Sequence, residues 1–377
     1  MQAVKNLKPE DVRTGPPAPA QSNEPNPFFQ PWILDNARRH LLAPHERFML
    51  AGDERRIILP LSVDRRIPGW LPTIAHIWGH KHCFDSTPLA QNPSRDDVKS
   101  LFDSLAGEGI DILRWRRLPM DTAFAAALLE FLKGQGLAHE ETKSYERSLL
   151  IADGSGPDSF FDRLGKRRRK DLRRRRQRLS ELGEVEFVTY QGRHDAMQWC
   201  HDFIELEASG WKGPSGTRTA IGCSESERAF FEAMARDGAA SGNIIVHSLT
   251  LDGKPVAITV NFRSGTWVWA YKVAYREDLA SLSPGVQLEV EGSRAFLSDP
   301  GIACVDSCVA SGRSLMNDLW PGRRPMAEFL IAVRPSANPM VRTSGLLWRR
   351  YLALKNAARD TIRSRRFPPR ASAAASA

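Results

Sequence analysis

Long apolar runs and paired cysteines are both missing from this 377-residue sequence. No run approaches the roughly 20 apolar residues that a membrane-spanning helix needs, and residues 1–26 lack the apolar stretch of a secretory signal peptide. The five cysteines are odd in number and form no C-x-x-C pair, which argues against a disulfide framework and a zinc ribbon. We therefore expect a cytoplasmic protein without a metal site, and a disordered leader over residues 1–26.

Basic residues are concentrated in two segments of a chain whose formal net charge is +9. Residues 163–178 hold eleven Lys or Arg against Asp171, and residues 341–377 hold nine against Asp360, so the remainder carries about −9. Ten of the thirteen residues from 166 to 178 are basic, and such like charges at i,i+4 spacing destabilise their own helix. Three interpretations remain for this basic run. Acidic groups of the protein neutralise it, an anionic partner binds it, or its side chains are simply exposed to water. No recognised DNA-binding motif accompanies it, so we do not expect nucleic acid as the partner.

The second basic segment also carries an apolar pattern. A final helix is predicted over residues 346–364, where Leu346, Leu347 and Trp348 stand beside Arg349 and Arg350. Such a helix packs its apolar side on the domain, or it lies on an anionic membrane surface. The second alternative would make the protein peripheral at the inner face of the membrane.

The first 150 residues alternate between helix and strand signals. The predicted helices cover residues 31–42, 94–107 and 121–134, and the predicted strands cover residues 47–50, 55–64 and 110–116. Ser94 and Asp121 are the expected N-caps of the second and third helices. The order of these elements predicts an α/β unit over residues 27–152.

The second half has a clearer β pattern. Three consecutive strands are predicted at residues 243–250, 255–263 and 266–273, joined by tight turns such as Asp252-Gly253. A long basic helix over residues 158–182, closed by Gly183, precedes them. The other predicted elements are strands at 185–190, 302–306 and 326–333, and helices at 196–209, 225–237 and 286–297.

Four sequence pieces occur in a fixed order over about half of the chain. They are the basic helix of residues 160–183, Glu205-x-Glu207-Ala208-x-Gly210-Trp211-Lys212-Gly213, Leu251-Asp252-Gly253-Lys254-Pro255-Val256-Ala257, and Tyr271-Lys272-x-Ala274-Tyr275 followed by Ser283-Pro284-Gly285. In these pieces the second half resembles the CelD/BcsL-like acetyltransferases of the GNAT superfamily, whose architecture is shared with the FemABX peptidoglycan transferases. The first half resembles that family's N-terminal portion at Phe28-Phe29-x-Pro31-Trp32 and Leu59-Pro60-Leu61.

The resemblance implies a fold and a reaction. A three-strand meander that leads into a helix and another strand is the core of a GNAT domain, so we expect an α/β fold (α+β, mixed sheet) with two GNAT-like domains in tandem. They would span residues 27–152 and 153–340, followed by a basic helix and tail over 341–377. The implied activity is acyl transfer from acetyl-CoA to an acceptor amine or hydroxyl, in polysaccharide or cellulose biosynthesis. A FemABX-like transferase that uses aminoacyl-tRNA is one alternative, and a non-catalytic basic nucleic-acid-binding or scaffold protein is another.

The expected donor site is the helix start Ser283-Pro284-Gly285-Val286. Ser is a favoured N-cap and Pro a favoured first helical residue, and a helix N-terminus with exposed amides binds anions. In a GNAT domain the CoA pyrophosphate lies at this point. The phosphate loop usual in that superfamily, Gln/Arg-x-x-Gly-x-Gly/Ala, is absent here. A helix start without a ligand is the structural alternative.

The remaining candidates surround the acceptor. Trp211, Lys212 and Lys272 are expected to bind substrate, and an anchor for their loop is the less favoured alternative for Trp211 and Lys212. Glu205 and Glu207 are general-base candidates, and a solvated helix face is the alternative. Asp306, at the end of a strand predicted beside the third meander strand, is the second base candidate or a buried structural residue. Tyr271 is expected to protonate the leaving thiolate or to line the cleft.

Overall fold

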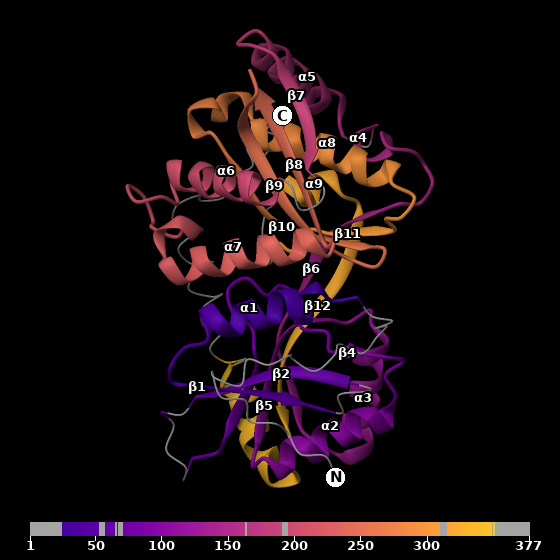
Figure 1. Cartoon of the computed structure of the whole chain (residues 1–377). Helices are drawn as coiled ribbons and strands as arrows, with labels where there is room; N and C mark the ends of the chain where they lie inside the picture. Colours follow the sequence, from indigo (N-terminus) through magenta and orange to yellow (C-terminus); the bar gives the residue numbers. More distant parts are fainter. Residues whose placement is uncertain are drawn as a thin grey trace, which may run out of the picture.

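The computed structural model describes residues 25–52, 57–64, 66, 71–162, 164–190, 195–309, 315–348 and 350. Within these residues the chain forms two lobes joined by one mixed sheet (Figure 1). The strands follow the order β1-β2-β3-β5-β12-β6-β11-β10-β9-β8-β7, and β4 pairs with β2 off this path. The predicted mixed α/β fold is therefore confirmed.

The lower lobe is built mainly from the first half of the chain (Figure 1). Its strands are β1 (Glu46–Ala51), β2 (Ile57–Asp64), β3 (Ile74–Ile77), β4 (Leu89–Ala90) and β5 (Ile112–Pro119), and its helices are α1 (Pro31–Leu41), α2 (Arg95–Gly107) and α3 (Ala123–Gln135). Ser94 caps α2 as predicted, in a capping box with Asp97. The expected cap of α3 was wrong, because the Thr122 hydroxyl accepts the Ala125 amide while the Asp121 carboxylate accepts a hydrogen bond from Arg324.

The upper lobe contains the predicted meander. Its strands are β7 (Val185–Tyr190), β8 (Ile244–Leu251), β9 (Lys254–Ser264), β10 (Trp267–Tyr275) and β11 (Cys304–Asp306), and its helices are α4 (Ser159–Asp162), α5 (Lys166–Ser180), α6 (Ala196–Ser209), α7 (Glu225–Ala240), α8 (Pro284–Ser298) and α9 (Leu315–Leu319). Neighbouring residues of β10 belong to different apolar clusters. Trp269 is in one cluster with Phe203 of α6 and Phe231 of α7. Val268 is in another cluster with Val290 of α8. The helices α6 and α7 therefore cover one face of the sheet, and α8 covers the other.

The two lobes repeat one strand arrangement. In the lower lobe β1, β2 and β3 are antiparallel, α2 follows, and β5 pairs parallel with β3. In the upper lobe β8, β9 and β10 are antiparallel, α8 follows, and β11 pairs parallel with β10. This repetition is what two GNAT-like halves in tandem would produce.

Two strands at the centre of the sheet connect the lobes. Strand β6 (His139–Ile151) pairs with β12 (Gly322–Ala332) along most of its length and with β11 at its end, while β12 also pairs with β5. The sequence did not predict β6, because its first eight residues are polar and exposed or half-buried, so the apolar alternation of a strand is missing. Since β12 completes the lower sheet, the domain boundaries expected at residues 152 and 340 do not coincide with a break in the sheet.

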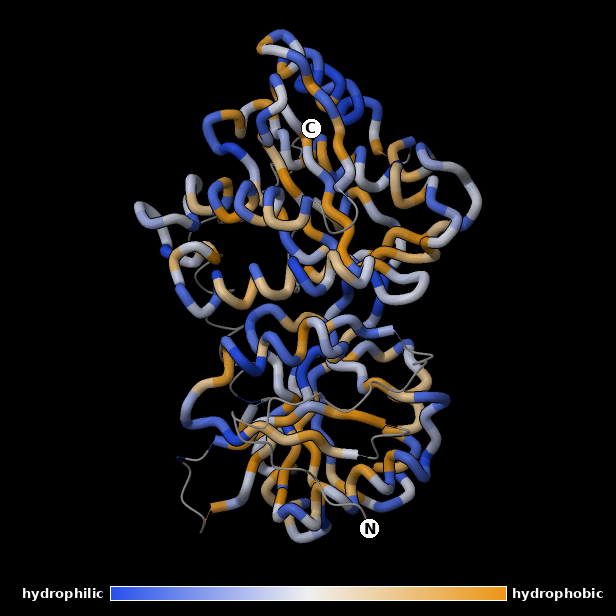
Figure 2. Tube along the Cα trace, viewed as in Figure 1, coloured by the Kyte–Doolittle hydropathy of each residue, from blue (hydrophilic) through white to orange (hydrophobic). Residues whose placement is uncertain are grey.

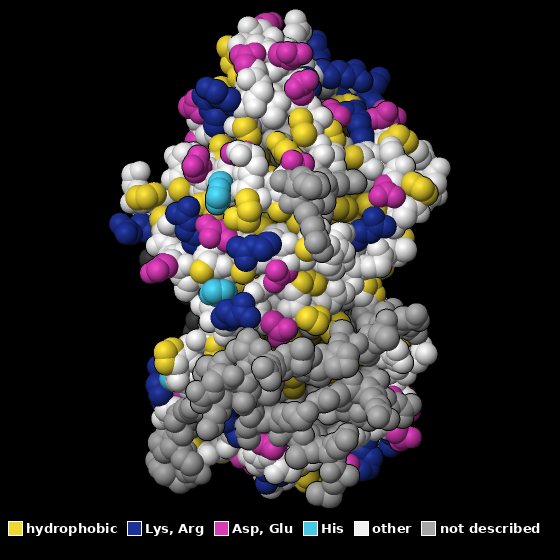
Figure 3. Space-filling view, viewed as in Figure 1, with side chains coloured by type: hydrophobic (Ala, Val, Ile, Leu, Met, Phe, Trp, Pro, Cys, Tyr) yellow, Lys and Arg dark blue, Asp and Glu magenta, His cyan; other side chains and the backbone are white. Residues whose placement is uncertain are grey.

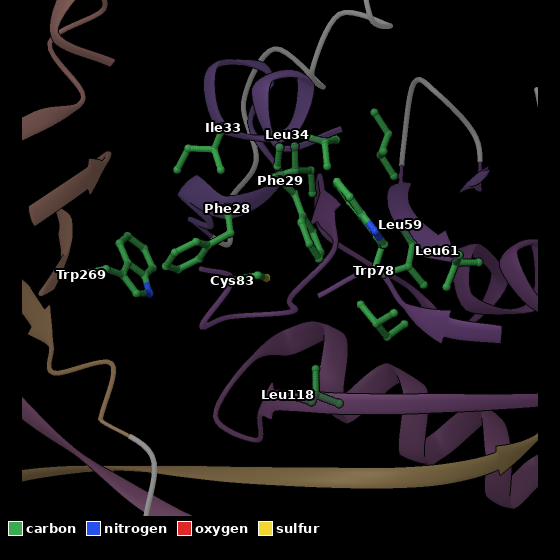
Figure 4. Close-up of a cluster of buried hydrophobic side chains, with 14 of the residues drawn as sticks. Phe28, Phe29, Ile33, Leu34, Leu59, Leu61, Trp78, Cys83, Leu118 and Trp269 are labelled. Atoms are coloured by element: carbon green, nitrogen blue, oxygen red, sulfur yellow. The ribbon is translucent and has the colours of Figure 1, made fainter. Parts of the chain in front are cut away.

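The largest apolar cluster extends through both lobes. Phe28 of the lower lobe lies beside Trp269 of β10, and Phe29, Trp78 and Leu59 continue the same cluster into the lower lobe (Figure 4). The Phe28 ring also meets the ring of Phe262 edge-on, with 5.8 Å between centroids. In Figure 2 the hydrophobic segments likewise gather along the strands, whereas α5 is almost uniformly hydrophilic. The two lobes are thus held by a shared apolar core as well as a shared sheet.

The long basic helix expected over residues 158–182 was wrong in extent. It is two helices, α4 and α5, because Gly165 before α5 has an extended ψ of 144°. Glu181 is the C-cap, so Gly183 is not the residue directly after it. Residues 1–24 of the expected leader lie outside the described residues, but Asn26 is buried and its side chain donates to the Thr87 carbonyl at 2.6 Å.

The final helix begins earlier than expected. Residues 338–348 and 350 are helical, and the Trp348 indole N–H donates to the Thr142 carbonyl at 2.7 Å. Residues 351–364 of the predicted helix lie outside the described residues, and so does most of the membrane-docking surface expected there. Within the described ranges, no helix combines the length and apolar content that crossing a bilayer requires.

Candidate active site

A cleft of about 400 Å³ opens where β10 and β11 separate. The two strands pair over only three residues, from Trp267 to Trp269 on β10, and β10 then continues to Tyr275 with a bulge at Tyr271. Bulges are common beside active sites because they redirect side chains. The cleft is lined by Phe84, Asn261, Ala270, Tyr271, Lys272, Val273, Tyr275, Ala280, Ser283, Gly285, Val286, Glu289, Ser307, Cys308, Val309 and Met316.

The N-terminus of α8 forms the mouth of this cleft. Ser283 has a left-handed backbone (φ 53°), and its side chain does not cap the helix as expected, because it accepts a hydrogen bond from Arg175 at 2.6 Å. The amides of Ser283 and Gln287 bond to backbone carbonyls, and Pro284 has no N–H. An anion would therefore be met by the first-turn amides of Gly285 and Val286, which lack partners within an α-helix. Three of the four predicted donor-site residues, Ser283, Gly285 and Val286, line the cleft.

Glu289 is a cleft residue that sequence reasoning missed. It lies one helical turn beyond Gly285, on the same face of α8. Burial raises the pKa of Glu289 to about 7, so its carboxyl changes charge near neutral pH. The i,i+4 spacing from Gly285 was a signal that could have found it.

Another residue of the cleft wall, Tyr271, contacts a residue from the first half of the chain. Its hydroxyl lies 2.6 Å from Nδ1 of His82, and its ring stacks on Phe262 with 4.3 Å between centroids. Burial raises the pKa of Tyr271 well above its usual range, and burial with nearby cations lowers the pKa of His82 to about 2. Both side chains are therefore neutral at physiological pH. The predicted cleft residue Tyr271 thus points its hydroxyl at His82.

The structure brings three other predicted residues together beside this wall. Glu207 is buried, and its Oε1 accepts hydrogen bonds from Lys212 and Lys272, each at 3.1 Å. Its Oε2 accepts the Ile221 amide at 2.8 Å. Burial alone would raise the pKa of Glu207, but Lys272, the Ile221 amide and Lys212 lower it, so this carboxylate stays ionised.

Two predicted residues of the same segment lie further out. Glu205 is exposed on α6 and does not line the cleft. Trp211 is 56% exposed, its amide donates to Glu277 at 2.8 Å, and the Lys212 ammonium lies 5.8 Å from its ring. Both therefore face solvent outside the cleft.

Asp306 ends β11 beside β10, as expected, but it does not line the cleft. It is completely buried, with its Oδ2 at 3.1 Å from Arg324 and 3.7 Å from Arg147, and its Oδ1 accepts the Cys308 amide at 2.8 Å. This geometry suits a residue that fixes the end of β11.

The cysteines are free thiols, and one of them, Cys308, lines the cleft. Burial, followed in size by the charge of Asp306, raises the pKa of Cys308 well above its usual range, so the thiol stays protonated. A protonated thiol is a poor nucleophile, so we do not expect Cys308 to form a covalent intermediate.

Cys308→Ala is accordingly expected to change the rate of acyl transfer by less than about threefold, since it removes no reacting group. The measurement is kcat/KM with the melting temperature recorded in parallel, and Cys304→Ala, outside the cleft, is the matched control. A drop of a hundredfold or more in Cys308→Ala alone, with the fold intact, would instead identify a covalent intermediate.

Comparison with known proteins agrees with this geometry. Residues 166–311 match the family model described as an Acetyltransferase (GNAT) domain, so most of the upper lobe is similar to that family. No curated protein is significantly similar to the chain in sequence.

Two solved structures share the fold over most of the chain. A conserved protein of unknown function from Bacteroides thetaiotaomicron is 13% identical with a TM-score of 0.54, and the match covers 89% of this chain and 100% of that one. FemX is 11% identical with a TM-score of 0.56, with 89% and 99% covered. At such identities the likeness shows the fold alone, but it includes both lobes.

Proposed function

We propose that the protein transfers an acyl group from a CoA thioester to an amine or hydroxyl of its acceptor. The observation that carries this proposal is the cleft between β10 and β11, with the first amides of α8 at its mouth. Helix N-termini bind phosphate, and the same cleft is also lined by Glu289, Phe84 and Tyr271. A donor in this cleft would hold its thioester between the separated strands β10 and β11, where an acceptor could reach it.

Glu289 is the general base in this proposal. An acceptor amine or hydroxyl attacks the thioester carbonyl, its proton passes to the Glu289 carboxylate, the new C–N or C–O bond forms, and the C–S bond breaks to release CoA thiolate. A carboxyl with a pKa of about 7 is suited to this task near neutral pH. Glu207 is a weaker candidate, since Lys272 and Lys212 lower its pKa.

The other predicted residues receive supporting roles. We assign Glu207, Lys212, Lys272 and Trp211 to acceptor binding and Tyr271 to the cleft wall. The resemblance to CelD/BcsL-like acetyltransferases supports an acetyl group as the acyl and a polysaccharide-related acceptor.

A second donor class is favoured by one observation. Helix α5 carries ten basic residues over thirteen positions, more positive charge than the few phosphates of a CoA molecule need. An aminoacyl-tRNA, whose backbone is a polyanion, would use such a helix more fully. CoA remains the first candidate because of the cleft and the family model over residues 166–311.

The donor is tested by thermal unfolding with CoA and with Gly285→Glu. A ligand that binds only the folded state stabilises it, by about 2.7 kcal/mol at a hundredfold excess over its Kd. Gly285→Glu puts a carboxylate where phosphate is expected, so the CoA-dependent rise in melting temperature should vanish. A side chain at residue 285 starts 3.1 Å from the Tyr275 ring, so the ligand-free melting temperature is recorded too.

The matched control is Gly107→Glu at the end of α2, where a side chain would meet nothing within 4 Å. It should keep the full CoA response. Wild-type protein that shows no shift with millimolar CoA would contradict the proposed donor.

A further inference from the structure

Helix α5 carries far more positive charge than the protein neutralises. Its 15 residues contain ten Lys or Arg, and Figure 3 shows basic side chains gathered at the top of the upper lobe over this helix. Among the described residues, three aspartates pair with it, since Asp162 binds Arg169, Asp318 binds Arg168, and Asp171 binds both Arg174 and Arg175. Neutralisation by the protein itself is therefore partial.

The basic side chains form a groove along one side of the helix. This open groove of about 680 Å³ is lined by Gly165, Arg167, Arg168, Lys170, Asp171, Arg174 and Arg175. These positions form two adjacent rows at i,i+3 and i,i+7 spacing, so their charges point the same way. Apart from Gly165, six side chains line the groove, and five of the six carry a positive charge.

The groove continues into the rim of the donor cleft. Arg175 donates to the Ser283 hydroxyl at 2.6 Å and to the Ser281 carbonyl at 3.1 Å, and Ser283 itself lines the cleft. Further along, Arg168 pairs with Asp318 at 2.7 Å, in the same short helix, α9, as the cleft residue Met316. The cleft and the basic groove therefore meet at the start of α8 and at α9.

The start of α8 offers two amides to a phosphate. Its left-handed Ser283 and its Pro284 leave the amides of Gly285 and Val286, and the glycine-rich phosphate loop of GNAT domains is absent from the sequence. Guanidinium groups match phosphate in two-pronged hydrogen bonds that are stronger than neutral ones. The α5 groove supplies one such group, Arg175, at Ser283, two residues before Gly285.

We propose that the α5 groove binds the phosphate groups of the donor's nucleotide portion while the acyl end lies in the cleft. This inference rests on the proposed function and adds the element that holds the donor. Because a run of like charges weakens its own helix, bound phosphate would also stabilise α5. The same chemistry recognises the phosphates of CoA or those of an RNA strand.

The test is the triple variant Arg167→Gln, Lys170→Gln, Arg174→Gln, with binding measured by calorimetry against CoA, pantetheine and deacylated tRNA. Each charged hydrogen bond to phosphate adds to the binding free energy, so the triple variant should bind CoA at least about tenfold more weakly. Its binding of phosphate-free pantetheine should stay unchanged. The matched control is Lys133→Gln, Arg236→Gln, Lys254→Gln, which removes the same charge from exposed positions off α5 and outside the groove and the cleft. It should bind CoA within about twofold of wild type, because exposed distant charges contribute little.

These measurements distinguish a CoA donor from an RNA donor, and they test the α5 groove separately from the proposed function. Loss of CoA affinity identifies a CoA donor, whereas retained CoA binding with a tenfold loss for tRNA and a shallower salt dependence identifies an RNA donor. Unchanged binding of both ligands overturns the inference and leaves the proposed function standing. A variant that loses only binding to vesicles of equal parts phosphatidylcholine and phosphatidylserine overturns it in favour of a membrane surface. Wild-type protein that does not bind CoA contradicts the proposed function itself.

Discussion

Replacing Glu289 by Gln is expected to lower kcat by roughly 10²- to 10⁴-fold, the usual contribution of a general base. Gln keeps the size of the side chain but cannot accept the proton from the acceptor. Glu289 lies in the cleft one turn beyond Gly285, so the loss should appear in kcat while CoA affinity stays near that of wild type. The measurement is steady-state kinetics together with CoA binding for the same protein.

The pH dependence gives the same residue a second test. The Glu289 carboxyl has a pKa of about 7 and acts as a base only when ionised, so kcat/KM of wild type should rise with pH and level off above about 7. Glu289→Gln should lack this rise. Glu291→Gln is the matched control, because Glu291 lies on the same helix but pairs with Arg294 outside the cleft.

Stability should move in the opposite direction from activity. The folded-state pKa of Glu289 lies above that of an unfolded glutamate, so the folded protein binds the proton more tightly, and stability falls as the pH rises from about 4.3 to about 7. Glu289→Gln removes this loss, and its melting temperature at pH 8 should equal or exceed that of wild type. Full activity with an unchanged pH profile in Glu289→Gln would rule out the assignment.

The parts of the fold that sequence predicted well are those with local signals. The meander β8–β10 follows from alternating apolar residues and the Asp252-Gly253 turn, and α2 follows from its capping box with Ser94 and Asp97. Strand β6 gives no such signal, because partners on both sides make it a strand although its first residues are polar. Tertiary contacts outweigh propensity in such elements.

The candidate site divides in the same way. The helix start at Ser283 to Val286 could be predicted from capping chemistry, and Glu207, Lys212 and Lys272 from sequence pieces that the fold brings together. The contact of Tyr271 with His82 could not, because the two residues are 189 positions apart and belong to different lobes. Burial by surrounding residues also sets the pKa of Glu289, and no local pattern shows it.

Arg324→Met is expected to lower the free energy of unfolding by about 3–5 kcal/mol, the usual cost of removing one partner from a buried ion pair. Arg324 is only 4% exposed, and its guanidinium lies 3.0 Å from Asp85, 3.0 Å from Asp121 and 3.1 Å from Asp306. Without it, the carboxylates of Asp85 and Asp306 remain buried, and among the described residues Arg147, at 3.7 Å, is the basic side chain that stays close to Asp306.

The control for this variant is the neighbouring Arg323→Met. Arg323 is exposed and donates to backbone carbonyls near α9, so its loss should cost no more than about 1 kcal/mol. Urea unfolding of both variants gives the comparison. Equal, small losses in the two would mean that the buried carboxylates find other partners.

The ion pairs of Arg324 also allow the role of Asp306 to be tested. Adding Asp306→Asn to Arg324→Met removes one of the stranded charges, so the double variant should lose less stability than the sum of the two single losses. Asp306→Asn alone should lower stability, and its activity should fall only as far as the end of β11 shifts, since the side chain lies outside the cleft. If Asp306→Asn kept its stability and CoA binding but lost kcat a hundredfold, Asp306 rather than Glu289 would be the base, and the acceptor would have to enter from the buried side of β11.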